Sequence, residues 1–245
     1  MTTELDLAQL LFEAQTDGRH DVDATPYSSL DRDAAYRVQT RVLDMLGGTP
    51  GMLKTGLHSD GVGVVAPILR SRVGHSGSFE LPSANVIGLE LEVGLVLGSD
   101  LTSDTARADE IDIIEAIDHY FVGIEICGSR YRDRALAGQN GGLADNMSAL
   151  GYAIDPTPRE RGADIHGLDV ELNFDGARIY AAPAKHGFGT VLASLVAYAR
   201  DQHPTYPLKA GTIVTTGSLC GLVPITGTGR VTGQLGNHIV AFDIV

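Results

Sequence analysis

The sequence predicts an α+β protein in which helices precede a strand-rich body. Over the first 48 residues, apolar side chains recur at helical spacing. From residue 51 the chain changes to short apolar runs broken by glycine, proline and serine, a texture typical of strands and turns. Because helices and strands do not alternate regularly, an α/β fold is disfavoured. We expect a helical segment over residues 1–50 and a strand-rich domain over 51–245, together forming one structural unit.

Both expected N-terminal helices carry boundary signals. A first helix over residues 7–14 follows Thr3, a candidate N-cap. A second helix begins near Ser28 or Ser29 and ends at Gly47-Gly48, because glycine commonly terminates helices.

Short apolar runs bounded by turn residues predict the later elements. The expected strands are Val62–Leu69, Gly77–Leu81, Asn85–Leu97, Tyr120–Cys127, Val170–Phe174, Arg178–Ala182, Thr212–Thr216, Arg230–Thr232 and His238–Ile244. Asp175-Gly176, between two of these strands, is a strong hairpin signal. Two further helices are expected, over Asp109–His119 and Phe188–Asp201.

Charge and composition restrict the class of partner. The net charge of −13 argues against nucleic acid or an anionic membrane surface, since both select basic proteins. No apolar run approaches the length of a membrane span, and the N-terminus lacks a basic, signal-like start. Cys127 and Cys220 do not make a disulfide framework, so we expect a cytoplasmic protein.

Glu90 and Glu92 interrupt an otherwise apolar strand, Leu89–Leu97. Side chains alternate along a strand, so the two glutamates share one face. The other face is apolar and consists of Leu89, Leu91, Val93, Leu95 and Leu97. A solvated strand face and a metal site explain the pair equally well.

Glu125 favours the metal site. It lies within a second apolar run, Tyr120–Cys127, with no obvious cation nearby in sequence. Burying an uncompensated charge is very costly. Three carboxylates without clustered histidine or cysteine suit Mg²⁺ or Mn²⁺ better than zinc.

Lys54 is the next candidate, because it is a single cation in an apolar, glycine-flanked segment. A desolvated lysine can act as a base or bind a substrate carboxylate. The alternative is a lysine whose stem packs at a strand end while its amine reaches water.

Three further segments carry candidate site residues. Asp145 follows the glycine-rich stretch 138–142, which is expected to form a flexible loop able to close over a site, or an ordinary surface turn. Arg130 begins an arginine cluster that could pair with an anionic substrate or start a solvated helix. Ser218 ends the late run 215–218, whose hydroxyls and amides could hold a substrate oxygen.

The order of these motifs resembles the fumarylacetoacetate hydrolase superfamily, in the branch of 2-hydroxypentadienoate hydratases and 4-oxalocrotonate decarboxylases. The resemblance rests on Ala35-Tyr36-Arg37-Val38-Gln39, Lys54-Thr55-Gly56-Leu57, Glu90-Leu91-Glu92, Glu125, Ala144-Asp145-Asn146 and Thr216-Gly217-Ser218, and it covers nearly the whole chain. It implies a mixed β-roll fold, a Mg²⁺ or Mn²⁺ ion and a homo-oligomer. It also implies a small 2-oxo or 2-hydroxy acid as substrate.

The same resemblance assigns roles. Glu90, Glu92 and Glu125 match the metal-binding carboxylates, and Lys54 matches the active-site lysine. Relatives carry a longer stretch after the lysine motif, with an acidic residue that assists proton transfer. Here His58 replaces the usual threonine and the stretch is short, so the catalytic candidates are Lys54, Asp145 and, as a substitute for the missing acidic residue, Asp60.

Two other departures bear on the reaction. The late segment 217–224 and the run 129–133 look closer to decarboxylase-like members, and the Gly-Asp pair usual before the final strands is missing around 227–230. We therefore expect a metal-dependent hydratase acting on a 2-hydroxy-dienoate in the catabolism of aromatic or related compounds. The alternatives are a decarboxylase of a 2-oxo-enedioate and a non-catalytic partner subunit of such an enzyme.

Overall fold

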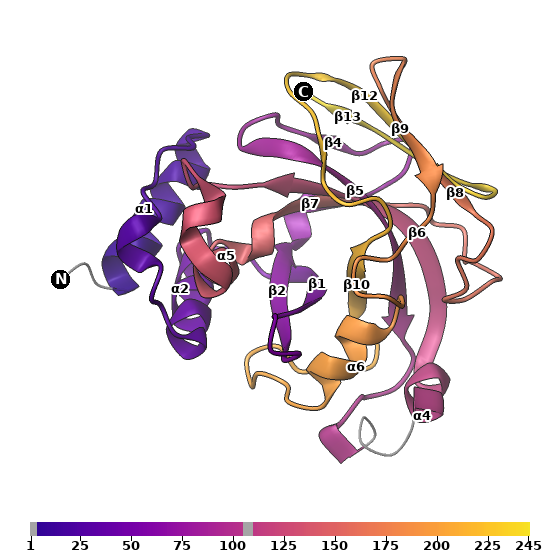
Figure 1. Ribbon diagram of the computed structural model, residues 1–245, viewed down its shortest axis with the longest axis horizontal. Coiled ribbons are helices and arrows are strands. Elements are labelled where there is room, and N and C mark those ends of the chain that lie inside the picture. Colours follow the sequence, from indigo (N-terminus) through magenta and orange to yellow (C-terminus); the bar gives the residue numbers. More distant parts are fainter. Residues whose placement is uncertain (1–3, 105–109) are drawn as a thin grey trace.

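Two β-sheets form the body of the molecule, and the N-terminal helices lie on one side of it (Figure 1). The computed structural model describes residues 4–104 and 110–245. The first sheet has the strand order β2-β1-β10-β5-β6-β7-β3, and β11 also pairs with β5. Its strands are β1 (Pro50–Leu57), β2 (Gly63–Leu69), β3 (Val73–His75), β5 (Val86–Leu97), β6 (Ile117–Gly128), β7 (Ala149–Ile154), β10 (Ile213–Ser218) and β11 (Val223–Pro224).

The second sheet has the order β4-β13-β12-β8-β9. Its strands are β4 (Glu80–Leu81), β8 (Asp169–Phe174), β9 (Ala177–Pro183), β12 (Gly229–Leu235) and β13 (His238–Ile244). Strands β8 and β9 form the hairpin predicted at Asp175-Gly176, where both residues have positive φ, as a tight hairpin turn requires.

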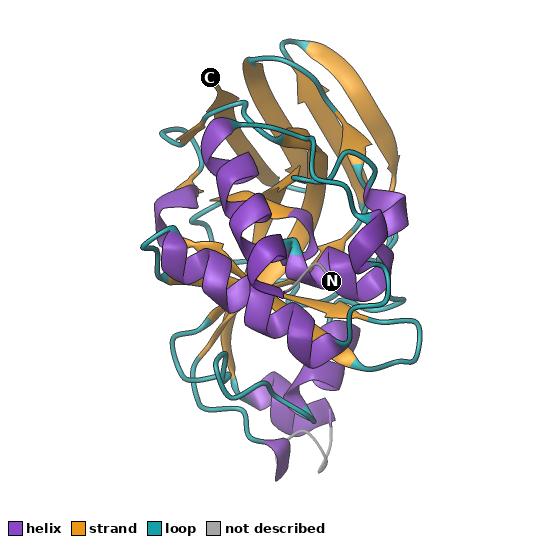
Figure 2. Cartoon of the chain, turned by 90° about the vertical axis from the view of Figure 1, so that its left-hand side faces the viewer, coloured by secondary structure: helices purple, strands orange, loops and turns teal. Residues whose placement is uncertain are grey.

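The α-helices are α1 (Glu4–Asp17), α2 (Arg32–Met45), α4 (Glu110–Glu115), α5 (Gly138–Ala144) and α6 (Ala193–Ala199). Short 3₁₀ turns lie at Thr25–Tyr27, Arg70–Arg72, Arg134–Ala137 and Asn146–Ser148. Figure 2 looks onto the N-terminal helices, which lie in front of the strands. None of the helices within the described ranges combines the length and the apolar character that crossing a membrane requires.

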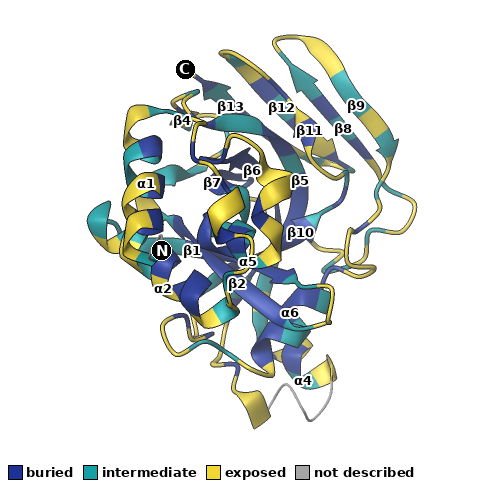
Figure 3. Cartoon of the chain, turned by 60° about the vertical axis from the view of Figure 1, so that its left-hand side comes forward, coloured by how far each residue is buried: buried dark blue, intermediate teal, exposed yellow. Residues whose placement is uncertain are grey.

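The interior between the two sheets explains why one face of β5 is apolar. Leu89, Leu91 and Val93 are fully buried and pack with residues of the second sheet, including Leu172 and Phe242. This confirms the predicted apolar face of β5, which appears as buried strand in Figure 3. The alternate residues of β5 therefore point to the other side of the first sheet.

The N-terminal helices share a core with the first sheet. Leu7 and Leu11 of α1 and Val38 of α2 belong to one buried cluster with Leu53 of β1 and Val65 of β2. Helix α2 begins after Asp31, whose carboxylate accepts a hydrogen bond from the Ala34 amide. The predicted start near Ser28 or Ser29 is therefore three to four residues early, because those residues follow a 3₁₀ turn. The predicted cap at Thr3 lies outside the described residues.

Several helices and strands begin or end at other residues than expected. One reason is that strand pairing between distant segments outweighs a local helical pattern. The helix expected over Asp109–His119 ends at Glu115, because Ile117 already pairs with Leu97 in the sheet; Asp109 lies outside the described residues. The helix expected over Phe188–Asp201 is shorter and spans α6. The strand expected over Gly77–Leu81 is reduced to β4, since Gly77 adopts φ +93° in a turn.

The glycine-rich stretch 138–142 is helical rather than a flexible loop. It forms most of α5, and side chains of both the helix and distant segments make tertiary hydrogen bonds that hold it. Gln39 donates to the Leu143 carbonyl at 3.0 Å, Tyr131 donates to the Gly141 carbonyl at 3.1 Å, and Asn140 donates to a carbonyl of the α1–α2 connection at 2.8 Å. These contacts offset the low helix propensity of glycine.

Candidate active site

The three glutamates predicted as metal ligands lie on one face of β5 and β6. In the antiparallel register Glu90 pairs with Glu125, and Glu92 pairs with Gly123. Directly opposed residues share a face, so the three carboxylates are neighbours. Glu92 and Glu125 are fully buried. The alternative of a solvated strand face is therefore wrong for Glu92.

Lys54 supplies the positive charge among these carboxylates. Its Nζ atom lies 2.6 Å from Glu125 Oε1 and 3.6 Å from Glu90 Oε2. Burial alone would lower the lysine pKa, but Glu125 and Glu90 outweigh burial and raise that pKa well above its ordinary value. Lys54 is thus a charged, buried residue of the site, and the surface alternative is wrong.

A raised pKa favours the charged form of the lysine but the neutral form of the glutamates. Burial raises the pKa of Glu125 to about 7, although the Lys54 ammonium opposes the shift. Burial and the neighbouring Glu125 charge raise the pKa of Glu92 well above its usual range. Strongly perturbed carboxyl groups beside a charged lysine are characteristic of functional sites.

Glu92 is held by a second set of side chains from β10 and β7. The Thr215 hydroxyl donates a short hydrogen bond to Glu92 Oε2 and lies 3.2 Å from the Tyr152 hydroxyl. The Tyr152 ring lies against Gly123, where a Cβ atom would come within 2.1 Å of the ring. Glycine is therefore required opposite Glu92.

A left-handed turn completes the surroundings of Lys54. Asn146, Met147 and Ser148 have φ values of +59°, +52° and +63°, an uncommon conformation for non-glycine residues. The turn directs the Met147 carbonyl to Lys54, whose Nζ donates to it at 3.3 Å. Asn146 Nδ2 donates to the Pro67 carbonyl at 2.5 Å and ties the turn to β2.

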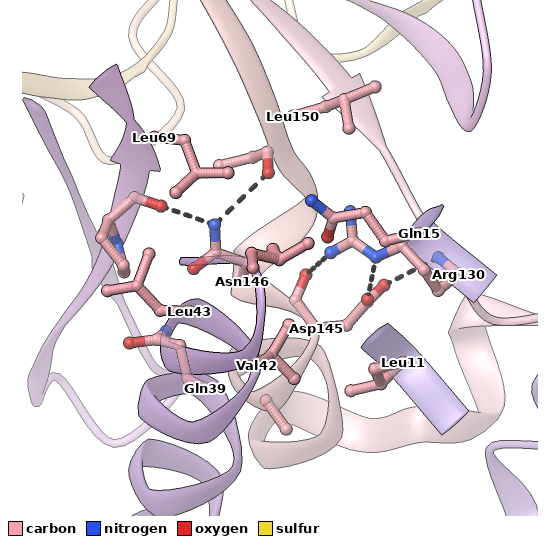
Figure 4. Close-up of a pocket in the computed structure, with 14 residues that line it drawn as sticks. Leu11, Gln15, Gln39, Val42, Leu43, Leu69, Arg130, Asp145, Asn146 and Leu150 are labelled. Atoms are coloured by element: carbon pink, nitrogen blue, oxygen red, sulfur yellow. Dashed lines mark hydrogen bonds and ion pairs between the residues drawn. The ribbon is translucent and has the colours of Figure 1, made fainter. Parts of the chain in front are cut away.

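Arg130 and Asp145, predicted as substrate-binding and catalytic residues, bind each other. Arg130 Nε donates to Asp145 Oδ1, and an Arg130 Nη atom donates to the Asp145 carbonyl at 2.5 Å. Ser129 donates to the remaining carboxylate oxygen at 2.8 Å. Figure 4 shows this pair at a small enclosed cavity between α1, α2 and the left-handed turn. The pair thus helps to hold the left-handed turn in place. The substrate-binding role of Arg130 and the catalytic role of Asp145 stay predictions.

Asp60 and Ser218 lie in two different places, Asp60 in the turn after β1 and Ser218 at the end of β10. Asp60 is exposed in the β1–β2 turn, where its carboxylate accepts a hydrogen bond from the Val62 amide at 3.0 Å. Ser218 pairs with Glu92 across a β-bulge between β10 and β5, and its hydroxyl donates to the Gly221 carbonyl at 3.2 Å. Bulges often re-aim side chains near active sites. The structure brings Ser218, not Asp60, next to a candidate metal ligand.

A hollow of about 260 Å³ opens beside Met147. Gly56, His58, Gln139 and Phe188 contribute to its lining. Met147 thus forms part of the hollow wall while its carbonyl contacts Lys54, so the hollow is the candidate approach for a small substrate.

Tyr152, Met147 and His186 were not identified from the sequence. Tyr152 lies in a strand whose residues are all buried, and no sequence pattern distinguishes it from an ordinary core residue. His186 is buried near Gly217, and burial lowers its pKa to about 4. It is a single histidine in the connection after β9 and belongs to no motif that would have revealed it.

The chain belongs to the fumarylacetoacetate hydrolase family, since residues 62–241 match the model of the fumarylacetoacetate (FAA) hydrolase C-terminal domain. It is similar to 2-keto-4-pentenoate hydratase of Paraburkholderia xenovorans, with 31% identity over 139 residues, which are 56% of this chain and 51% of the relative. The aligned part therefore spans about half the length of that relative. A hydratase of the same name from Paraburkholderia phymatum is 28% identical over 84% of this chain and 82% of its own.

Solved structures confirm the expected fold. The 4-oxalocrotonate decarboxylase of Pseudomonas putida G7, complexed with magnesium and adipate, superposes with a TM-score of 0.80 over 100% of this chain and 99% of its own, at 19% identity. A complex of the same enzyme with calcium and acetate gives a TM-score of 0.79 at the same coverage and identity. The helices and curled sheets described above are thus the fold of this family.

The described residues fit a divalent ion. Within the described ranges, Glu92 Oε1 and Glu125 Oε2 are buried without a hydrogen-bond partner. Carboxylate oxygens with unused lone pairs are the ligands that Mg²⁺ and Mn²⁺ prefer. Glu90, Glu92 and Glu125 are therefore suitable residues to hold such an ion.

Proposed function

We propose that this protein is a divalent-metal-dependent hydratase acting on a 2-hydroxy-2,4-dienoate or its 2-oxo-4-enoate form. The observation that carries the proposal is the buried group of Glu92, Glu125 and Lys54, with Glu90 opposite Glu125. The hydratases to which the chain is similar support the same reaction class. A bound Mg²⁺ or Mn²⁺ would act there as a Lewis acid on the C2 oxygen of the substrate.

The protein's own residues then have distinct tasks. Lys54 holds a positive charge at the carboxylate cluster and can neutralise the substrate carboxylate or move a proton at Nζ. Thr215 keeps the Glu92 carboxylate in place through a hydrogen bond, and the Tyr152 hydroxyl contacts the Thr215 hydroxyl. The Met147 side chain lies over Gly56 and lines the hollow through which the substrate would enter. A proton delivered to the substrate carbon converts the dienol to an enone, which accepts water.

The alternative is decarboxylation of a 2-oxo-enedioate. It is favoured by the full-length similarity in fold to 4-oxalocrotonate decarboxylase and by a 25%-identical decarboxylase relative from a Pseudomonas species. A Lewis acid on the C2 oxygen would favour protonation at carbon, and it would equally stabilise the electron pair released when CO₂ leaves. Both reactions thus use one site.

An assay with 2-hydroxypenta-2,4-dienoate separates these proposals. We expect loss of dienol absorbance that requires Mg²⁺ or Mn²⁺ and that falls at least about a hundredfold in Glu92→Gln. Glu80→Gln, an exposed glutamate of the second sheet, serves as the matched control and keeps full activity. Release of CO₂ from a diacid without hydration of the dienoate would support the decarboxylase instead. Absence of both reactions from wild-type protein expressed alone, with Mg²⁺ or Mn²⁺ supplied, would point to a non-catalytic partner subunit.

We further propose a cytoplasmic homo-oligomer that acts in the catabolism of aromatic or related compounds. The proposal is supported by the family to which the chain belongs and by its two cysteines, neither of which forms a disulfide. Light scattering of the purified protein would measure the assembly directly.

A further inference from the structure

Cys127 lies beside two of the glutamates. It follows Glu125 by two residues on β6, so the two side chains share a face. Its Sγ atom lies 3.7 Å from Glu125 Oε1. One ligand atom each from Glu90, Glu125 and Cys127 lies within 4.8 Å of the other two. Across the sheet, Cys127 pairs with Gly88, as Glu125 pairs with Glu90.

The neighbouring carboxylate has an atom available for a cation. Glu125 is fully buried, and its Oε2 atom has no hydrogen-bond partner within the described ranges. Lys54 contacts the other oxygen, Oε1, and therefore leaves Oε2 open. A buried carboxylate oxygen without a partner is costly unless a ligand satisfies it.

The second cysteine occupies a different environment. Cys220 Sγ accepts a hydrogen bond from the Leu91 amide at 3.4 Å and lies 3.6 Å from the Ser218 hydroxyl. It is not part of the group formed by Glu90, Glu125 and Cys127. Because the sequence contains only these two cysteines, Cys220 is the matched control for any effect of a thiol.

We propose that Cys127 is a further metal ligand and that it shifts the preference of the centre towards thiophilic divalent ions. This inference rests on the metal centre of the proposed function. Carboxylates alone favour hard ions such as Mg²⁺, whereas a sulfur ligand favours Co²⁺, Zn²⁺ or Cd²⁺. One sulfur added to the three carboxylates suits a borderline ion, and binding releases the thiol proton to solvent.

Cobalt absorption tests the ligand directly. Metal-free protein titrated with Co²⁺ is expected to develop a sulfur-to-cobalt charge-transfer band in wild type and in Cys220→Ser, but not in Cys127→Ser. By calorimetry, Cys127→Ser should bind Cd²⁺ at least about tenfold more weakly than wild type, while its affinity for Mg²⁺ changes less than about twofold. An undiminished band in Cys127→Ser, or its loss in Cys220→Ser, overturns the proposal.

A second measurement needs no variant. The ¹¹³Cd resonance of the wild-type complex distinguishes a sulfur-containing ligand set from oxygen ligands alone, so the inference stays testable even if Cys127→Ser does not fold. Binding of Co²⁺ or Cd²⁺ with oxygen ligands only would exclude Cys127 as a ligand and leave the proposed metal centre intact. Failure of wild-type protein to bind Mg²⁺, Mn²⁺, Co²⁺ or Cd²⁺ would overturn the metal centre together with this inference.

Discussion

The Lys54 ammonium lies 2.6 Å from a carboxylate oxygen of Glu125, a residue 71 positions further along the chain. The pair links β1 to β6, two strands that are not neighbours in the first sheet. A buried charge pair of this kind depends on both partners, because removal of one leaves the other charge without compensation.

Replacing Lys54 by methionine should therefore affect both stability and activity. We expect a loss of roughly 3–5 kcal/mol in the free energy of unfolding at pH 8, where Glu125 is ionised. Hydratase activity should fall at least about a hundredfold. Urea titration and the dienol assay measure the two effects. Lys209→Met, which breaks an exposed pair with Asp100, should cost less than about 1 kcal/mol and leave activity unchanged.

The left-handed turn stores backbone strain that glycine can relieve. Ser148 has φ +63° and Asn146 and Met147 precede it in the same conformation. Ser148→Gly should therefore be more stable than Ser148→Ala by about 1 kcal/mol, because only glycine adopts this conformation without a steric cost. Chemical denaturation of the two variants provides the comparison. Equal midpoints would show that the turn relaxes when the side chain at position 148 is changed.

The pairing of Arg130 with Asp145 predicts a structural rather than a chemical consequence of mutation. Arg130→Met should cost about 3–5 kcal/mol because the Asp145 carboxylate stays buried, and Asp145→Leu should be similarly destabilising. The double variant should recover part of the loss, as expected for residues that interact directly. A fall in kcat for Asp145→Asn without any loss of stability would instead support the catalytic role predicted from the sequence.

Gly123 should not tolerate a side chain. A Cβ atom there would lie 2.1 Å from the Tyr152 ring, so Gly123→Ala must displace Tyr152 and, with it, the Thr215 contact to Glu92. We expect a loss of at least about 2 kcal/mol and weaker Mg²⁺ binding. Gly142→Ala is the control, since a Cβ atom at that position would enter open space and helix α5 would gain propensity. Thermal unfolding and calorimetry give the two quantities.

His186 predicts how stability depends on pH. Burial lowers its pKa from 6.5 to about 4, so the unfolded chain binds a proton between these values that the folded protein does not bind. Its contribution to stability is present above pH 6.5 and is lost as pH falls towards 4, up to roughly 3 kcal/mol. Urea midpoints of wild type and His186→Asn between pH 7.5 and 4.5 should converge at the acidic end. Parallel curves would assign the acid sensitivity to other groups.

Some elements that follow from local periodicity were predicted correctly from the sequence. The alternation along Leu89–Leu97 predicted a strand with apolar residues on one face and Glu90 and Glu92 on the other, and the structure confirms both faces. The hairpin at Asp175-Gly176 was also predictable, because its turn conformation requires these residue types locally. The ordered motifs further indicated the family, which the match over residues 62–241 confirms.

Tertiary structure decided what lies next to these residues. Whether Lys54 reaches water or Glu125 depends on how the first sheet curls, and no local pattern encodes that distance. The sequence predicts a substrate site or a solvated surface for Arg130 and Asp145, yet they bind each other in the interior. The left-handed turn at Asn146 exists because long-range contacts to Pro67 and Lys54 offset its strain. The sequence by itself thus determined the strand, its acidic face and the family. The packing of distant segments determined the charge balance of the site, because burial and ion pairing act through space rather than along the chain.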